Sequence, residues 1–165
     1  MSDYGLLKLI HIGSLILWLG PALGAWLVLR ALDDKNFAGG AVAAKVSRVF
    51  YVTVIIEHVA FVGLLTSGFY LAHTYHFFGS PWLTQKLAIV LLIIVPLEVV
   101  DIILGNWLAS TASRKAYAGM ALKSWERRGL EIYHGAFTKI ALLVLPISVL
   151  LILYLATSKT GILPV

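Results

Sequence analysis

The sequence predicts an all-α integral membrane protein built as a single bundle of four helices. Of its 165 residues, 60% are hydrophobic and only 13% are charged, with a mean hydropathy of +0.92. Soluble domains carry about one quarter charged residues, and a chain of this length cannot hide so much apolar surface in its own core. The surplus must face lipid, which excludes a soluble enzyme, a nucleic-acid-binding domain and a disordered chain.

Four apolar stretches are long enough to cross a bilayer as helices, which takes about 20 residues each. We expect spans at about residues 4–29, 49–75, 83–109 and 130–156, forming one transmembrane domain over residues 1–165. The short alternating strands of a membrane barrel are absent from the sequence. The first span lacks a basic leader and exceeds the apolar length of a secretory signal, so we expect it to be retained.

Positive charge is distributed unevenly among the segments that connect the spans. The second connection has only Lys86 and the tail only Lys159, whereas the first and third connections carry Arg30, Lys35, Lys45, Arg48, Arg114, Lys115, Lys123, Arg127 and Arg128. The positive-inside rule then places those two connections in the cytoplasm and both termini on the outer, periplasmic side of the inner membrane. Residues 118–128 are expected to form a short interfacial helix.

Ionisable residues inside the spans are the candidates for function, because each is costly in lipid unless it is paired or liganded. By depth they form an outer layer of His11, His73, His76 and Lys86, and an inner layer of Glu57, His58, Glu98, Asp101, His134 and Lys139. Asp101 and Lys139 fall at similar depth, so we expect a buried ion pair between them. The chain has no cysteine, which excludes disulfides, iron–sulfur clusters and c-type haem attachment.

The histidines suggest ligands for a cofactor. His58, His73 and His76 lie along one broad stripe of the second span, since His58 and His76 are separated by five helical turns. Neutral imidazole binds haem iron, copper or zinc, and four-helix bundles hold such sites between facing helices. We expect one or two such sites, with His11 and either His73 or His76 as the ligands of the first and His58 and His134 as those of the second. Hydrogen-bonded core positions, or a loop position for His76, are the alternative interpretations.

Two motifs carry a family resemblance. The first span reads LLKLIHIGSLILWLG, with His11 and Trp18, and the third opens with SPWLTQKLAIVLL, which contains Lys86. Over spans one to three the chain resembles a group of small bacterial membrane proteins. The group includes HemJ-type protoporphyrinogen oxidases, the membrane domain of copper-resistance protein D and an uncharacterised family.

The resemblance implies a helical bundle that binds haem b. It makes His11 an axial ligand and places Trp18 in the same motif, while Lys86 would pair with a haem propionate. The chain departs from the HemJ pattern, since Pro21 is followed by Ala22 in place of arginine, and Glu57-His58-Val59 replaces a Pro-Ala-Met element. These departures weigh against porphyrinogen oxidation, and the additional imidazoles favour electron transfer.

Three functional hypotheses follow. The first is a haem b-binding membrane cytochrome, surrounded by lipid, with a redox protein or quinone as partner. It would act alone, as a homo- or hetero-oligomer, or as an anchor subunit of a respiratory complex, and its inner carboxylates would accompany electrons with protons. The second is a HemJ-like protoporphyrinogen oxidase. The third is a copper-binding or copper-transport protein using His11, His73 and His76, which is disfavoured because both methionines lie outside the spans.

Overall fold

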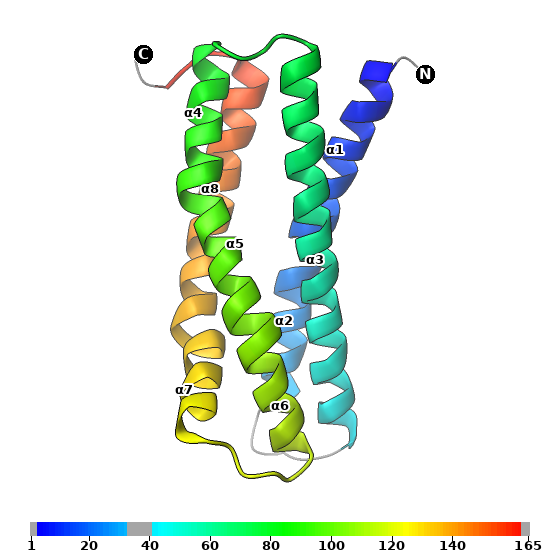
Figure 1. Ribbon diagram of the computed structural model, residues 1–165, viewed down its shortest axis with the longest axis vertical. Helices are drawn as coiled ribbons and strands as arrows, with labels where there is room; N and C mark the ends of the chain where they lie inside the picture. The colour runs from blue at the N-terminus through cyan, green and yellow to red at the C-terminus, as the bar shows by residue number, and fades with distance from the viewer. Residues whose placement is uncertain (1–2, 33–40, 163–165) are drawn as a thin grey trace.

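The computed structural model describes residues 3–32 and 41–162, and within them it is an all-α bundle without strands (Figure 1). Four helical rods in this part of the chain are long and apolar enough to cross a membrane: Asp3–Val28, Ala41–Thr74, Pro81–Tyr117 and Ser124–Ser158. The all-α class and the four predicted spans are therefore confirmed. The rods extend past several predicted boundaries because polar residues continue the helices beyond the apolar stretches.

The first rod is broken and the second is continuous. Helix α1 (Asp3–Leu19) ends just before Gly20, and the backbone N–H of Gly20 still donates to the carbonyl oxygen of Ile16 at 2.8 Å. Helix α2 (Pro21–Leu32) then begins with proline, which has no N–H to donate and is favoured at the first helical position. Helix α3 (Ala41–Thr74) crosses the whole bundle and packs against both α1 and α2.

The third rod changes neighbours halfway along its length. It consists of α4 (Pro81–Ile89), the π-helix η1 (Val90–Ile94), α5 (Val95–Asp101), the π-helix η2 (Ile102–Ala109) and α6 (Ser110–Tyr117). Segment α4 packs against α8, whereas η2 and α6 pack against α3, so the rod crosses the bundle diagonally (Figure 1). π-Turns and proline are common causes of helix bending, and η1 directly precedes the segment that contains Pro96.

The fourth rod begins before the predicted span. It comprises α7 (Ser124–Ile132), the π-helix η3 (Tyr133–Phe137) and α8 (Thr138–Ser158). The separate interfacial helix expected over residues 118–128 does not form, because residues 118–123 make a turn and α7 runs directly into the rod. Glu126 anchors this turn by accepting the backbone N–H of Lys123 at 2.8 Å and by pairing with Lys115.

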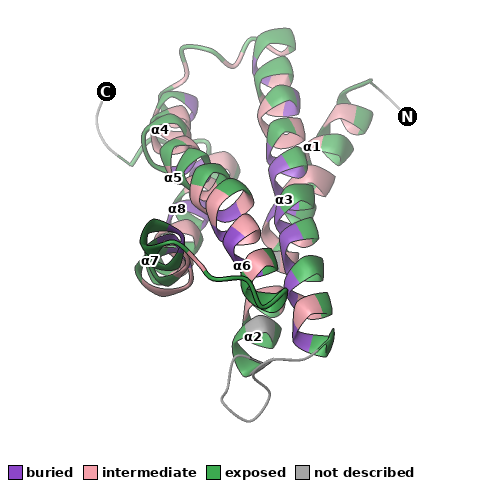
Figure 2. Ribbon diagram, turned by 60° about the horizontal axis from the view of Figure 1, so that its bottom comes forward, coloured by how far each residue is buried: buried purple, intermediate pink, exposed green. Residues whose placement is uncertain are grey.

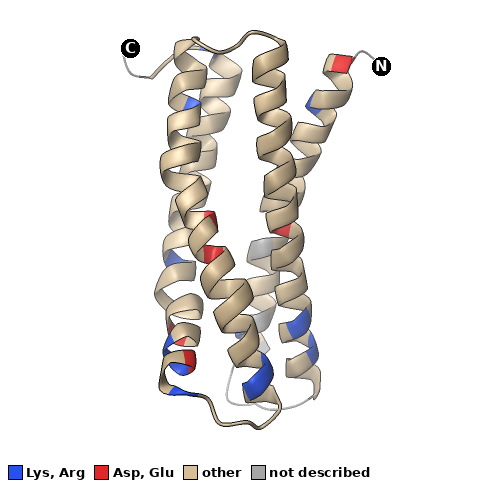
Figure 3. Cartoon of the chain, viewed as in Figure 1, with Lys and Arg blue, Asp and Glu red and all other residues tan. Residues whose placement is uncertain are grey.

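Charges separate along the long axis of the bundle (Figure 3). The described ends of the chain, near Asp3 and Ile162, lie together at one end of the molecule (Figure 1). The other end, called the basic end below, holds Lys45, Arg48, Arg114, Lys115, Lys123, Arg127 and Arg128, while Lys35 lies outside the described residues. Acidic side chains occur at middle height, inside the apolar part of the rods.

Two buried apolar clusters lie one above the other. One joins Phe50, Tyr51, Val54, Ala109 and Tyr133, and the other joins Trp18, Ala60, Phe61, Ile94 and Val149. Large apolar side chains such as Leu92 and Trp107, each 76% exposed, cover the outside of the rods, and Figure 2 shows exposed residues along the outer faces. In a bilayer these faces contact lipid. The interval of α3 between the two clusters contains Glu57 and His58.

Candidate functional site

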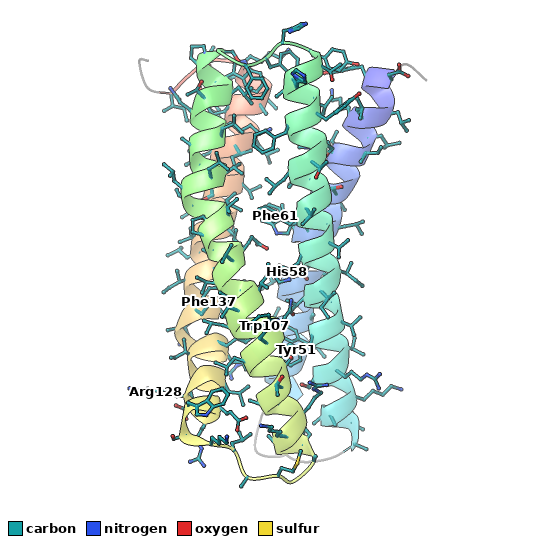
Figure 4. All side chains as sticks on the ribbon, viewed as in Figure 1. Tyr51, His58, Phe61, Trp107, Arg128 and Phe137 are labelled. Atoms are coloured by element: carbon teal, nitrogen blue, oxygen red, sulfur yellow. The ribbon has the colours of Figure 1, made fainter. Side chains whose placement is uncertain are left out.

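A group of polar side chains, called the central cluster below, fills the level between the two apolar clusters. It contains Trp18 from α1, Glu57 and His58 from α3, Glu98 and Asp101 from α5, and Asn106 from η2. Figure 4 shows Phe61, His58 and Tyr51 following one another down the inner side of α3. The diagonal course of the third rod brings its two carboxylates to this level, opposite α3.

His58 is the hub of the central cluster. Its Nε2 lies 3.5 Å from Glu98 Oε2 and 3.4 Å from Asp101 Oδ2. The Asn106 side-chain amide lies 3.2 Å from His58 Nδ1, and since an amide nitrogen only donates, Nδ1 is the acceptor. This assignment from the hydrogen-bond network places the ring proton on Nε2, facing both carboxylates.

Trp18 holds Glu98 from the opposite side. Its indole Nε1–H donates to Glu98 Oε1 at 3.0 Å, and both side chains are buried. The Trp18 ring packs on Phe61 with 5.1 Å between ring centroids. Both oxygens of Glu98 therefore face nitrogen atoms, one of an indole and one of an imidazole. The sequence predicted Trp18 as a cofactor-binding residue, and in the structure its polar atom contacts this carboxylate.

Glu57 differs from the other carboxylates because one of its oxygens is unpaired. The residue is 7% exposed, and Oε1 has no hydrogen-bond partner in the described part of the chain. Buried polar atoms without partners are rare and costly. Glu57 lines a cavity of about 550 Å³ together with Trp18, Glu98 and Asp101. The central cluster thus forms part of the wall of a space large enough for a small ligand.

The cavity lies between the first rod and the fourth. Its far wall is apolar and comes from α8, including Leu145 and Val149. Leu23 and Leu150 also line it and are 50% and 66% exposed, so the cavity reaches the apolar outer surface of the bundle. A ligand dissolved in the bilayer could enter there without crossing a polar end.

A second polar group lies nearer the basic end, around His134. Tyr51 Oη bonds Ser113 Oγ at 3.0 Å and His134 Nε2 at 3.2 Å. The rings of Phe50 and Tyr133 surround this imidazole. His134 is therefore a hydrogen-bonded histidine inside an aromatic cluster.

His11 belongs to the interface between α1 and α3. Its Nδ1 lies 3.1 Å from the Leu64 carbonyl oxygen and 3.1 Å from Ser67 Oγ. A carbonyl only accepts, so Nδ1 carries the proton and Nε2 retains its lone pair. A Cβ on Gly68 would lie 2.9 Å from His11 Cε1, so glycine allows the ring to sit directly on α3. Partly buried Lys86 interacts electrostatically with this imidazole.

The structure brings together some of the predicted site residues and separates others. His11 lies between α1 and α3 and Lys86 lies on α4, whereas His73 and His76 are exposed at the end of α3, and His76 adopts a left-handed backbone with φ of 54°. No group of His, Asp and Glu side chains in the described ranges is arranged to hold a metal ion.

The expected ion pair between Asp101 and Lys139 is wrong. Asp101 faces His58, and Lys139 is exposed on the outer side of α8. Two residues at the same depth can point to different sides of a bundle. Similar depth therefore did not establish that Asp101 and Lys139 face each other. Asp101 instead completes the central cluster.

Sequence reasoning missed Asn106, Tyr51 and Ser113. Asn106 lies five residues after Asp101, a spacing that separates two side chains on an α-helix but brings them to one face of a π-helix. The π-helical character of η2 is therefore what aligns them. The one signal in the sequence is that Asn106 is a polar residue in an otherwise apolar stretch.

No family model, curated protein or solved structure matches this chain. Its function is therefore inferred from two features of its own geometry: the central cluster with its cavity, and His11 with Lys86.

Proposed function

We propose that this chain is a haem b-binding redox protein of the cell's inner membrane, in which His11 would hold a single haem. The observation that carries the proposal is the orientation of His11. His11 Nδ1–H donates its hydrogen bond to the Leu64 carbonyl oxygen, which leaves the lone pair of the neutral imidazole's Nε2 available to bind a metal. Histidines that ligate metals typically donate their other ring N–H to a carbonyl or carboxylate in this way.

The surrounding residues suit this cofactor. The Ser67 hydroxyl donates to the Gly63 carbonyl at 2.7 Å, so its oxygen is available to accept from His11 and helps to fix the ring. Lys86 is a cation placed to pair with a propionate carboxylate. Bound haem supplies one-electron redox chemistry, at a potential set by its ligand and its burial. His58 and His134, the expected ligands of a second haem, instead contact Asp101 and Tyr51, and this supports one haem per chain.

The protein's own residues would orient the cofactor and exclude water. Leu64 and Ser67 fix the imidazole, while the apolar rods keep the site at low dielectric. Electron transfer across such a site changes the local charge, and the central cluster provides acidic and imidazole groups that can hold a compensating proton inside the membrane. Its electron partner would be a redox protein or a quinone.

An optical spectrum tests this proposal. We expect the purified full-length protein to show a Soret band, a reduced-minus-oxidised b-type difference spectrum and one haem per chain by pyridine haemochrome assay. His11→Gly should remove the spectrum, and added free imidazole should restore it. The matched control is His76→Ala, because His76 is exposed at the same end of the bundle.

A second variant guards against simple misfolding. Gly68→Ala keeps the imidazole but adds a Cβ 2.9 Å from His11 Cε1, so haem content should fall while the protein remains monodisperse. Absence of a Soret band in the wild type, or an unchanged spectrum in His11→Gly, would refute the proposal. Metal analysis that found copper in place of iron would favour the copper-binding alternative.

The orientation of the chain follows from its charges. We propose that the basic end faces the cytoplasm and that both termini lie outside. The chain has no cysteine, so single cysteines can be placed at Phe78 and Met120, which are 51% and 54% exposed in opposite connections. A membrane-impermeant maleimide should label Phe78→Cys in intact spheroplasts and Met120→Cys only after lysis. The reverse pattern would invert the topology.

Porphyrinogen oxidation is the second candidate, favoured by the cavity beside Trp18 and its carboxylates. Such an enzyme needs a space for a tetrapyrrole substrate that is separate from its own cofactor. Growth rescue of a strain lacking protoporphyrinogen oxidase would support this activity. Failure of rescue by a well-expressed protein would leave electron transfer as the better interpretation.

A further inference from the structure

The cavity in the middle of the bundle presents one unpaired donor and one unpaired acceptor. Trp26 Nε1 on α2 and Glu57 Oε1 on α3 are both buried, and neither has a hydrogen-bond partner in the described structure. Both residues line this same cavity. A buried donor or acceptor without a partner is expensive, and two of them around one space indicate a ligand that satisfies both.

The remaining walls restrict the kind of ligand. Most of the lining is apolar, and aromatic rings of Trp18 and Tyr133 contribute to it. The cavity reaches the lipid-facing surface beside Leu23 and Leu150. A phospholipid headgroup does not reach this depth, and an entirely apolar molecule would leave both polar atoms unpaired. The ligand must therefore be soluble in the bilayer, flat enough for aromatic walls, and equipped with both a carbonyl-type acceptor and a hydroxyl-type donor.

We propose that this cavity binds the head group of a membrane quinone. The Trp26 indole N–H donates to a carbonyl oxygen of the oxidised form, and Glu57 Oε1 accepts from a hydroxyl group of the reduced form. Glu98 accepts the Trp18 indole N–H and Asp101 Oδ2 faces His58 Nε2 at 3.4 Å, so Glu57, whose Oε1 has no partner, is the carboxylate left for the ligand. This inference deepens the proposed redox function by naming its partner, but binding itself does not require haem.

Quinone titration of the full-length protein in lipid nanodiscs tests the proposal. Oxidised decylubiquinone should quench tryptophan fluorescence saturably, and both redox forms should raise the unfolding temperature, since ligands that bind only the folded state stabilise it. Trp26→Phe should weaken binding of the oxidised form by about fivefold to tenfold, the effect of one lost hydrogen bond. Glu57→Leu should weaken binding of the reduced form by a similar or larger factor.

The matched control is Trp107→Phe, because Trp107 is 76% exposed on the outer face and should not affect affinity. Leu145→Trp is a second test variant, since a larger side chain in the cavity wall should block binding while both polar groups remain. Decylbenzene, which has the tail but no carbonyl, should not compete with the quinone.

Three results would overturn the inference. Quenching that never saturates and is equal in Trp26→Phe and Trp107→Phe would show that the quinone only dissolves in lipid. Competition by decylbenzene would show that the cavity takes an alkyl chain. Unchanged affinity in Leu145→Trp would place the quinone elsewhere. Binding that persists in His11→Gly would support this inference even if the haem proposal failed, so the two proposals fail separately.

Discussion

His11 and His58, one half-buried between α1 and α3 and the other buried at the centre of the bundle, have contrasting surroundings. His11 meets neutral groups, a backbone carbonyl and a serine hydroxyl, each 3.1 Å from Nδ1. His58 meets an amide on one nitrogen and two carboxylates on the other. The same side chain is thus a neutral donor atom in one place and the partner of negative charge in the other. Neighbouring groups, more than residue type, decide what a membrane histidine can do.

Helix packing explains the contrast. Around His11, small residues bring α1 and α3 close together, and a Cβ on Gly63 would lie 3.0 Å from Ser14 Oγ. Such close packing of small residues leaves room only for short polar contacts. Around His58, the third rod crosses the bundle and carries Glu98 and Asp101 to α3. The crossing also leaves the cavity on the side of the fourth rod.

Replacing His58 should give the largest loss of stability. His58→Leu leaves buried Glu98 and partly buried Asp101 without their imidazole, and breaking a buried charged pair costs about 3–5 kcal/mol. Denaturant titration in mixed micelles would measure the unfolding free energy. The triple variant with Glu98→Leu and Asp101→Leu should recover most of the loss. If His58→Leu lowered the unfolding free energy no more than His11→Leu does, the contrast between the two sites would be refuted.

Trp18→Phe should have the next largest effect. It removes the N–H that bonds Glu98 Oε1, and hydrogen bonds to charged groups contribute about 1.5–3 kcal/mol. The same unfolding assay would detect this, with Trp107→Phe as a lipid-facing control that should change little. Equal effects of the two replacements would mean that the indole N–H does not support the cluster.

His11→Leu should cost less, about 1 kcal/mol in the haem-free protein, because only neutral hydrogen bonds are lost. Ser67→Ala should cost a similar amount. The double variant should cost less than the sum, because both residues belong to one hydrogen-bonded group. Additive losses would show that the two side chains act independently.

The smallest effect is expected at the basic end, where Lys115 pairs with Glu126. The Lys115 side chain is 36% exposed, so salt screens the pair, and buried Glu126 keeps a second partner in the Lys123 backbone N–H. Lys115→Gln should therefore lower the unfolding temperature slightly at low ionic strength and not at high ionic strength. A salt-independent loss comparable to that of Trp18→Phe would identify this pair as a structural anchor.

Much of the molecule follows from the sequence alone. Composition determined the membrane class, the lengths of the apolar stretches determined the four rods, and the basic residues predicted which end collects positive charge. The depth of each ionisable group followed from counting residues along a helix. His11 and Lys86 could be grouped at one depth in this way, and Lys86 interacts electrostatically with His11.

Only the tertiary structure decided which side chains face one another. Asp101 pairs with His58 and not with Lys139, Trp18 reaches Glu98, and Asn106 joins the group through a π-helix. Hydropathy and residue counting fix how deep a side chain lies, but contact also depends on the rotation of each helix about its axis and on where a rod bends. Those angles are set by packing between residues far apart in the chain, so they are not encoded in any single stretch of sequence.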